Sequence, residues 1–546
     1  MADNTTPKVR RSIHDMQLEY ERGDKQAMED LVRAWQGIQA LPPSDERSFF
    51  SLGGYHGEPF QYRKAVDALD ETDNYAYWGG YCNHGNILFP TWHRAYLFKL
   101  EQALQSIVPG VMLPYWDETD EYSMQSGIPS ILTQETFTFA DGRTIPNPLQ
   151  SFALPVALSD GVASDDRAYE KPAGYQTVRY PLSGLVGTPQ AREQSAQHNA
   201  QYPDHERNVA LLNQNIKAWL RGNKPTTGDP TPAADGVYEQ FKQCLDAPNY
   251  TVFSNTTSSS VWNQTNSGKV TSLESPHNDI HLAVGGFDLP GQRQSGQIAG
   301  ANGDMGENNT AGMDPIFFFH HCNIDRIFWL WQKRHEQTDT LTVLSGFPGT
   351  SSNDEQGPTR GVAPGAKLTL ASHLAPFKSA AGDLLTSLDC INIETQLGYT
   401  YAPGSFDGDI VVKRLLGDQR VAGGKKLHVS GINRSAYQGS FVLEAYAMVE
   451  GADGTASKRY LGHNSVLSRY NVVRCANCLT HIDVMAHFPL LDMTDTEAAS
   501  ARFHVELRSR TGIDMITPSD QAKMRVLPMN AVTGAAPKTA EIKLID

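Results

Sequence analysis

The chain has 546 residues and a formal net charge of −15, with 40% hydrophobic and 20% charged residues and with abundant glycine (46) and proline (31). It exceeds the roughly 250 to 300 residues at which one hydrophobic core stops growing, so we expect at least two globular domains. An acidic chain with no long basic run lacks the positive charge that would attract nucleic acid or an anionic membrane. We therefore expect small neutral molecules as partners.

Targeting and redox signals are weak along the chain. The first residues, MADNTTPKVRRSIHDMQ, lack the apolar core of a signal peptide, and no window reaches the apolar length of a membrane span. The cysteines are few for this length, as expected where thiols stay reduced. We therefore expect a soluble, cytoplasmic protein. The six cysteines are Cys82, Cys244, Cys322, Cys390, Cys475 and Cys478.

The first third of the chain carries three histidines in aromatic-rich surroundings. His56 lies in YHG, His84 in CNHG, and His93 in FPTWHRAYLFKLEQAL. Pro90 and Thr91 suit the first turn of a helix, and the apolar residues that follow recur at helical spacing. The sequence predicts a helix over residues 89–104 with His93 near its start and facing inward.

A second histidine pair occurs in SPHNDIHLAVGG, where His277 and His281 are four residues apart. Residues at this spacing share one face of a helix, so both imidazoles could converge on one point. A lone pair of this kind is more often a surface pair or a hydrogen-bonded pair than a metal site. The pair therefore needs further ligands from elsewhere in the chain.

A third segment, MDPIFFFHHCNIDRIFWLW, predicts a helix that is apolar on all sides. Asp314 is expected as its N-cap and Pro315 as its first residue, and His320 and His321 lie within it. His321 follows Phe317 by one turn and precedes Asp325 by one turn. One helix face should thus carry an aromatic ring, an imidazole and a carboxylate.

Six imidazoles in two groups of three suggest a pair of metal ions. Neutral imidazole binds copper as well as zinc, and a site with three such ligands leaves positions open for an exogenous ligand. Two ions facing each other could bridge dioxygen. Any one histidine could instead be a buried, hydrogen-bonded residue, and a dizinc hydrolase would usually use a bridging carboxylate, which these motifs lack.

The segments HGNILFPTWHRAYL, ESPHNDIHLAVGG and DPIFFFHHCNIDRIFWLW resemble the two copper-binding signatures of the tyrosinase, catechol oxidase and haemocyanin superfamily. YWDET, GANGDMGEN, YTY and CANC extend the resemblance over nearly the whole chain, and it is strongest to fungal, cytoplasmic, latent tyrosinases. The resemblance implies a mainly α catalytic domain, a four-helix bundle around a dicopper centre, followed by an all-β, sandwich-like domain.

The resemblance also implies the ligands of two copper ions, which form a binuclear type 3 centre with O2 as co-substrate. Of the adjacent pair His320 and His321, the family pattern makes the second the ligand. Phe317 matches the aromatic residue that packs between the two ions. The implied ligands are His56, His84 and His93 for the first copper, and His277, His281 and His321 for the second.

Other site residues follow from the same resemblance. Cys82 matches the cysteine that forms a thioether with the second histidine, here His84; a small buried thiol is the alternative. Asp325 and Arg326 match a pair for which we expect hydrogen bonding and ion pairing around the site rather than chemistry.

Glu274 and Asn278 flank His277 and match the carboxylate and amide thought to hold a water as base. Glu274 could equally be an acidic residue placed at a helix N-terminus by the dipole. The resemblance implies ortho-hydroxylation of small phenols and oxidation of o-diphenols to o-quinones, a melanin-type pigment chemistry. The alternatives are an oxidase of o-diphenols or o-aminophenols without monophenol activity, or a haemocyanin-like oxygen carrier.

The sequence changes character after Tyr399-Thr400-Tyr401, which in the family ends the catalytic domain and is braced by an N-terminal arginine, here Arg10. We expect a catalytic domain over 1–402, a linker over 403–420, and a β domain over 421–546. KKLHVSGI, GSFVLEAYAMVEG and ARFHVELRSR alternate apolar and polar residues as half-buried strands do. In relatives this domain covers the copper site and inserts a side chain; Val466 or Leu467 would be that plug.

Cys475-Ala-Asn-Cys478 is a CxxC motif without a second CxxC. Two thiolates are soft ligands that suit copper(I), and in fungal relatives such a pair is held to load the active site. One alternative is a zinc site with His481 as a third ligand, and another is a disulfide or redox pair. The long insertion over residues 120–270 could carry contacts of a homo-oligomer, which the sequence leaves open.

Overall fold

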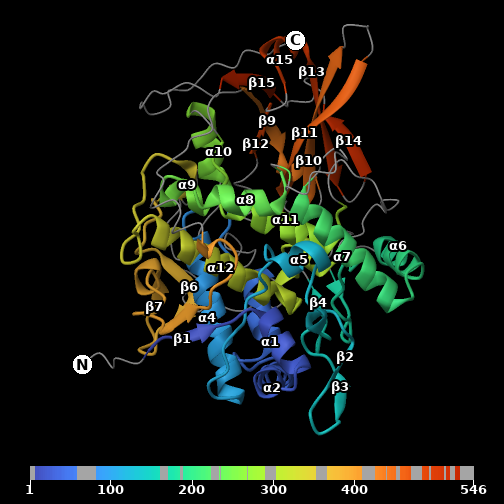
Figure 1. Cartoon of the computed structure of the whole chain (residues 1–546), viewed down its shortest axis with the longest axis vertical. Helices are drawn as coiled ribbons and strands as arrows, with labels where there is room; N and C mark the ends of the chain where they lie inside the picture. The colour runs from blue at the N-terminus through green and yellow to red at the C-terminus, as the bar shows by residue number, and fades with distance from the viewer. Residues whose placement is uncertain are drawn as a thin grey trace.

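The computed structural model describes residues 6–57, 81–159, 170–184, 189–222, 233, 235–266, 269–288, 303–351, 366–408, 425–437, 439–450, 456–468, 483–490, 493–509, 512–516 and 523–528. These residues form a helical part, which precedes residue 409, and a β-rich part, which begins at residue 425 (Figure 1). The fold class predicted from the sequence is therefore confirmed.

The α-helices bury the apolar stripes that their sequences carry. In α2, Met28, Leu31, Trp35 and Ile38 recur at helical spacing and are all fully buried. The described α-helices are α1 (Ile13–Glu21), α2 (Gln26–Ala40), α3 (Phe49–Gly57), α4 (Phe89–Ile107), α5 (Glu121–Ser126), α6 (Pro189–Asn199), α7 (His205–Arg221), α8 (Val237–Cys244), α9 (Tyr250–Ser254), α10 (Thr256–Thr265), α11 (Glu274–Gly285), α12 (Ile316–Arg334) and α15 (Asp495–Ser500).

Helix α12 is buried along almost its whole length, from Ile316 to Gln332, as its apolar sequence predicts. It begins one residue later than expected, because Pro315 takes the N-cap position. Asp314 accepts the Ile316 main-chain N–H at 3.1 Å but is also bound by Arg179, so the carboxylate joins helix and neighbouring loop. The long buried helix is thus held at its start by an ion pair.

The two ends of the helical part are joined by a short parallel ladder. Strand β1 (Lys8–Arg10) pairs with β8 (Tyr399–Tyr401), with Lys8 opposite Tyr399 and Arg10 opposite Tyr401. The Arg10 guanidinium lies 3.6 Å from the centre of the Tyr399 ring and donates to the Tyr401 hydroxyl at 3.0 Å. The predicted brace between Arg10 and the YTY motif is confirmed.

Three further two-stranded ladders lie in the connecting segments of the helical part, and all are antiparallel. They are β2 (Thr136–Thr138) with β3 (Thr144–Pro146), β4 (Leu158–Ser159) with β5 (Glu170–Lys171), and β6 (His373–Lys378) with β7 (Leu384–Thr386).

The C-terminal part consists of two sheets, with strand order β11-β10-β13-β14 in one and β12-β9-β15 in the other. Leu427 and Val429 of one sheet and Leu443 and Val505 of the other enter the same hydrophobic cluster, which is the packing of a sandwich. The three predicted strands correspond to β9, β10 and β13. The bounds are β9 (Lys425–Asn433), β10 (Phe441–Glu450), β11 (Ala456–Val466), β12 (Asp483–Pro489), β13 (Arg502–Ser509), β14 (Gly512–Ile516) and β15 (Lys523–Pro528).

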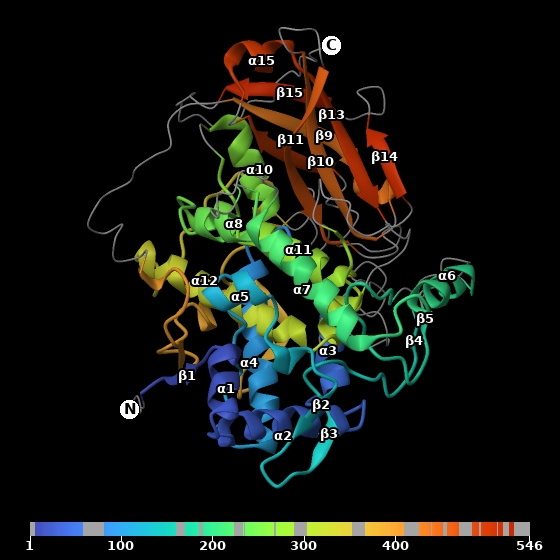
Figure 2. The same ribbon diagram turned by 45° about the vertical axis from the view of Figure 1, so that its right-hand side comes forward.

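The β-rich part lies against one end of the helical part, over α10 and α11, in both views (Figures 1 and 2). Strand β11 contacts α11 and strand β12 contacts α10. Since α11 carries His277 and His281, the C-terminal part lies close to the predicted copper ligands. Among the described helices, none has the length and apolar content needed to cross a membrane.

Candidate metal centre

Three of the predicted ligands form one cluster. His56 lies on α3, His84 in the loop before α4, and His93 on α4. One ligand atom of each lies within 4.8 Å of those of the other two. The structure thus brings together three histidines that are distant in the sequence, and their role as copper ligands stays a prediction.

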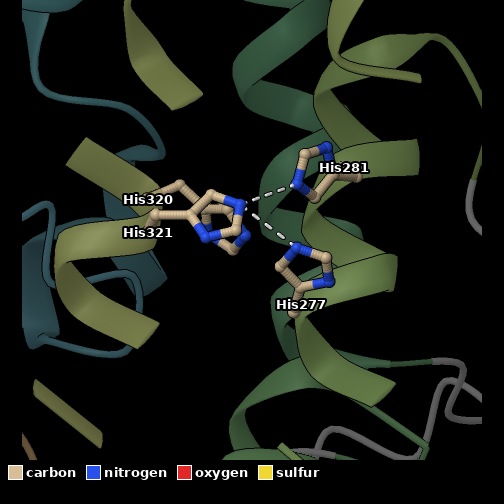
Figure 3. Close-up of side chains that lie close together, drawn as sticks. All are labelled: His277, His281, His320 and His321. Carbon is tan, nitrogen blue, oxygen red and sulfur yellow. Dashed lines mark hydrogen bonds between the residues drawn. The ribbon is translucent and has the colours of Figure 1, made fainter. Parts of the chain in front are cut away.

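The second cluster lies between two helices (Figure 3). His277 and His281 project from α11, and His320 and His321 from α12. The Nε2 atom of His321 lies 3.2 Å from Nε2 of His277 and 3.3 Å from Nε2 of His281. Nitrogens bound at about 2.0 Å to one tetrahedral ion are roughly 3.3 Å apart, so this spacing fits a metal ion.

The two clusters face each other. The rings of His93 and His321 stack with centroids 4.4 Å apart, and those of His84 and His277 lie 5.6 Å apart. Helices α3, α4, α11 and α12 all contribute a histidine. The arrangement is that of a binuclear site inside a four-helix bundle.

Main-chain carbonyl oxygens bind the outward nitrogen of three imidazoles. A carbonyl can only accept a hydrogen bond, so Nδ1 carries the proton and Nε2 keeps its lone pair for a metal. Among the described residues, Nε2 of His93 has no hydrogen-bond partner, which fits that role. The pairs are His56 with Asn308 at 3.1 Å, His93 with Phe89 at 2.8 Å, and His281 with Met305 at 2.8 Å.

Burial keeps the imidazoles neutral. It lowers the pKa of His93 to about 3, and it lowers the pKa of His84, His277, His281 and His321 well below the usual value. A metal ion binds the neutral form, so no proton has to be displaced at neutral pH. The chemistry of this donor set fits copper.

His320 takes a different position from its neighbour His321. Its Nδ1 lies 2.5 Å from a carboxylate oxygen of Glu118, and Asn323 donates to the other oxygen of Glu118 at 3.3 Å. Its Nε2 has no hydrogen-bond partner among the described residues and lies near the second cluster. Sequence reasoning missed Glu118, although YWDET contains it, because nothing in the motif shows where its side chain points.

Phe317 lies between the two clusters. Its ring stacks on His321 with centroids 4.0 Å apart and meets His56 edge-on at 4.8 Å. It also meets His281 edge-on at 5.7 Å. The ring therefore contacts imidazoles of both groups and limits the space between them.

Asp325 joins α12 to the N-terminal ladder. It accepts from Arg94 at 2.6 Å and from the Tyr399 and Tyr401 hydroxyls at 2.6 Å each. Burial raises the pKa of Asp325, but Arg94 and Arg10 outweigh it and hold this pKa below its usual value. The contacts of this side chain are hydrogen bonds and ion pairs.

Arg326, the neighbour of Asp325, binds the end of the helical part. It pairs with Asp407 and donates to the Ser405 carbonyl oxygen at 2.8 Å. It also lies 3.9 Å from Asp117. Like Asp325, it stabilises the surroundings of the centre without touching the imidazoles.

Glu274 and Asn278 lie beside the imidazoles. Glu274 accepts from the Gly85 main-chain N–H and from the Thr256 N–H, both at 2.8 Å. Burial raises the pKa of Glu274. Asn278 accepts from Nδ1 of His277 at 3.0 Å, so its amide oxygen orients a predicted ligand, a contact that the sequence did not indicate.

Cys82, two residues before His84, is buried at 5% exposure. The side-chain amide of Asn308 donates to its sulfur at 3.7 Å. A covalent bond between Cys82 and His84 stays a prediction. Cys475, Cys478 and His481 lie outside the described residues, so their interpretation also stays a prediction.

A cavity of about 80 Å³ adjoins the first cluster. His84, Glu274 and Asn278 line it from the helical part. Val466 and Leu467, both buried, line it from the C-terminal part. Both plug candidates therefore line the cavity, and their role as a plug stays a prediction. Arg434 of the same part, which the sequence did not single out, lines the cavity as well.

The fold and the paired imidazole clusters define a binuclear copper oxidoreductase site built from four helices. Residues 46–334 match the family model for the common central domain of tyrosinase. A tyrosinase from Hahella sp. (strain CCB-MM4), HcTyr2, is 58% identical over 519 residues, which cover 93% of each chain. An Aspergillus oryzae tyrosinase is 41% identical over 527 residues, 92% of each chain.

A solved structure gives the same result. The tyrosinase from Burkholderia thailandensis at low pH is 61% identical and superposes with a TM-score of 0.84, covering 95% of this chain and 100% of that one. The chain belongs to the tyrosinase family. It is an enzyme that uses a binuclear copper centre and O2 to oxidise phenols. The narrower prediction of a fungal, cytoplasmic member stays a prediction.

Proposed function

We propose that the enzyme hydroxylates monophenols at the ortho position, oxidises the resulting o-diphenols to o-quinones, and is made in a latent form. The ligands in this proposal are three imidazoles of each cluster; the set for the second cluster leaves out His320, whose Nδ1 is bound by Glu118. They are His56, His84 and His93 for one copper, and His277, His281 and His321 for the other.

The copper pair supplies the activation of O2 and the redox change, and the chain supplies position and proton transfer. A monophenol must lose its hydroxyl proton, and we assign this step to a water held by Glu274 and Asn278. Both side chains line the cavity beside His84. Burial raises the pKa of Glu274 above its usual value, which makes its carboxylate a better base than an exposed one.

Glu274 is also held in one orientation. Gly85 donates to one oxygen, and the main chain and hydroxyl of Thr256 donate to the other at 2.8 and 2.9 Å. Gly85 directly follows His84, so the carboxylate and a predicted ligand are positioned by the same loop. Phe317 would limit where the phenol ring lies by occupying the space between the clusters.

The size of the cavity under Val466 and Leu467 supports the proposal of latency. A cavity of about 150 Å³ holds benzene, whereas this one measures about 80 Å³. A phenol is larger than benzene and has no room beside His84 while the C-terminal part stays in place. Removing or moving that part would open the site.

The test measures O2 uptake by the copper-loaded chain with a monophenol and with an o-diphenol, before and after cleavage. A protease recognition sequence inserted after Gly408 would allow cleavage between the helical part and strand β9. Uptake with both substrates after cleavage, and little before it, is the expected result. Equal uptake before and after cleavage would refute latency.

The same experiment separates the alternative enzyme. Uptake with the o-diphenol alone, in the cleaved protein, would identify an o-diphenol oxidase without monophenol activity. Asn278 favours monophenol activity because its amide, next to His277, can hold the water together with Glu274.

Two cysteine proposals accompany the function. Cys82 forms a thioether with His84: an S–H and an imidazole C–H bond are replaced by a C–S bond, and O2 at the copper centre would be the oxidant that takes up the two hydrogens. Mass spectrometry of the peptide containing both residues would detect the loss of two hydrogens. Cys475 and Cys478 deliver copper: replacing both with serine should slow loading from dilute copper and leave the fully loaded enzyme active. Unchanged loading would refute the delivery role.

A further inference from the structure

Arg434 is a cationic side chain that the C-terminal part places beside the metal centre. It begins a single 3-10 turn, Arg434–Ala436, directly after strand β9, and it lines the cavity with His84 and Glu274. A guanidinium next to a site for two metal cations is electrostatically unfavourable unless it has a compensating partner. Its position therefore calls for an explanation.

Arg434 binds the segment that covers the centre. This plug segment, Val466–Ser468, is the end of strand β11 and the two residues after it. Nε of Arg434 donates to the Ser468 hydroxyl at 3.0 Å, and Nη2 donates to the Leu467 carbonyl oxygen at 2.5 Å. Two donors of one planar group fix the main chain and a side chain of the segment together.

The helical part binds the same segment through one main-chain bond. The Asn308 N–H donates to the Ser468 carbonyl oxygen at 3.1 Å. The carbonyl oxygen of Asn308 accepts from Nδ1 of His56 at 3.1 Å. The plug segment is thus joined to the residue that orients a predicted copper ligand.

Glu274 supplies the compensating charge. Burial lowers the pKa of Arg434 to about 10, and the nearby Glu274 carboxylate counteracts this, so the guanidinium stays charged at neutral pH. Glu274 itself is buried at 3% exposure. Charges in a closed cavity are screened much less than charges in water. The closed arrangement therefore gains from an attraction that is lost when the C-terminal part moves away.

We propose that Arg434 is the latch of the latent enzyme: it holds the plug segment over the copper site and pairs electrostatically with Glu274, the residue assigned to proton transfer. The C-terminal part would then restrain Glu274 as well as block the entry of substrate to the copper site. This inference rests on the proposed function, because a latch has an effect only if the closed form is latent.

The test compares variants of the uncleaved, copper-loaded chain by O2 uptake with an o-diphenol. Arg434→Gln removes the charge and the paired donors, and we expect uptake roughly tenfold or more above that of the uncleaved wild type. Ser468→Ala removes only one acceptor and should give a smaller rise. Arg459→Gln is the matched control: Arg459 lies on β11 and pairs with Glu497 at 3.2 Å, away from the cavity, and its loss should leave uptake unchanged.

Cleavage after Gly408 then separates the latch from the proposed function. After cleavage, all four proteins should reach the same rate if only the closed state was affected. The latch would be overturned, and latency left intact, if two results came together. Uncleaved Arg434→Gln and Ser468→Ala would both be as inactive as uncleaved wild type, and cleavage would activate every one of these proteins. A wild type that is fully active before cleavage would overturn both.

Discussion

At the scale of single residues, three imidazoles of the centre offer one nitrogen to the metal and bind a main-chain carbonyl with the other. The carbonyl oxygens of Asn308, Phe89 and Met305 bind the outward nitrogens, which selects one tautomer before a metal arrives. Such preorganised ligands lose little freedom on binding copper. The centre should therefore depend strongly on each imidazole.

Replacing one of these ligands should empty one copper position. His281→Ala or His84→Ala should halve the copper content of the loaded protein and abolish O2 uptake, because the reaction needs both ions. Metal analysis and an oxygen electrode measure the two effects. His373→Ala, at an exposed position on β6, is the control and should keep both copper and activity. A His281→Ala protein with full oxidase turnover would contradict the assignment.

Glu274→Gln should separate the two reactions. We expect monophenol hydroxylation in the cleaved enzyme to fall by roughly a hundredfold, as for loss of a general base, while o-diphenol oxidation persists. Steady-state rates with both substrates measure this. An equal loss with both substrates would mean that Glu274 only holds the loop at Gly85 and Thr256.

The sequence was sufficient to identify the imidazoles but not their partners. Histidines within recognisable motifs can be paired by helical spacing, as His277 and His281 were. The carbonyl of Met305 and the carboxylate of Glu118 come from segments whose direction depends on tertiary packing. Arg434 could not be found because it reaches the site from another domain, and no pattern near it has chemical meaning.

At the scale of elements, Arg10 of the ladder of β1 with β8 joins α4 to α12. Arg10 is fully buried, and it binds Glu101 of α4 at 3.0 Å and approaches Asp325 of α12 at 3.5 Å. Two helices that carry copper ligands are thereby joined through one guanidinium. Removing it would leave the buried carboxylate of Glu101 without its cationic partner, while Asp325 would keep Arg94.

Arg10→Ala should therefore destabilise the protein by about 3–5 kcal/mol, the usual cost of breaking a buried ion pair. Urea unfolding measures the change. Arg47→Ala is the control, since Arg47 is 50% exposed and pairs at 2.7 Å with Asp45, whose side chain is 25% exposed. Its loss should destabilise the protein much less than the loss of Arg10. Equal effects of the two substitutions would contradict the assigned role of Arg10.

Periodicity predicted the elements that are long or strongly alternating, among them α4, α12, β9 and β10. Periodicity predicted no helix or strand between residues 120 and 270, where the structure has α5 to α10. Two of these helices are only five or six residues long, and α6 is polar, with no apolar stripe to detect. Such helices form because neighbouring segments hold them, so their sequences alone carry little signal.

At the scale of the whole molecule, the two parts meet at a buried ionic group. His463 of β11 lies 3.1 Å from Asp279 of α11 and 3.5 Å from Asp235, and the Tyr460 hydroxyl lies 3.1 Å from its Nδ1. Burial lowers the pKa of His463, but the two carboxylates outweigh it and raise this pKa to about 9. The protonated imidazole therefore stabilises the docked arrangement.

This stabilisation should depend on pH. Because the folded pKa lies above the unfolded value of about 6.5, the contribution is complete below that pH and is lost as pH rises through about 9. His463→Gln should lower the melting temperature most near pH 6 and least near pH 9.5. If the difference in melting temperature between wild type and His463→Gln did not narrow over this range, the assignment would be contradicted.

His504 provides the control within the same domain. Burial lowers the pKa of this imidazole, so its charge does not contribute in the same window. The difference in melting temperature between wild type and His504→Gln should not narrow between pH 6.5 and 9.

The ladder of β1 with β8 also determines where the chain can be separated into two polypeptides. Lys8–Arg10 and Tyr399–Tyr401 lie side by side, so the helical part starts and finishes at one point and encloses its own hydrophobic core. The β-rich part, which begins at residue 425, follows this junction in the chain and is not enclosed by it. A detached β-rich part, expressed as its own polypeptide and added back to the cleaved enzyme, should silence it again in proportion to its concentration.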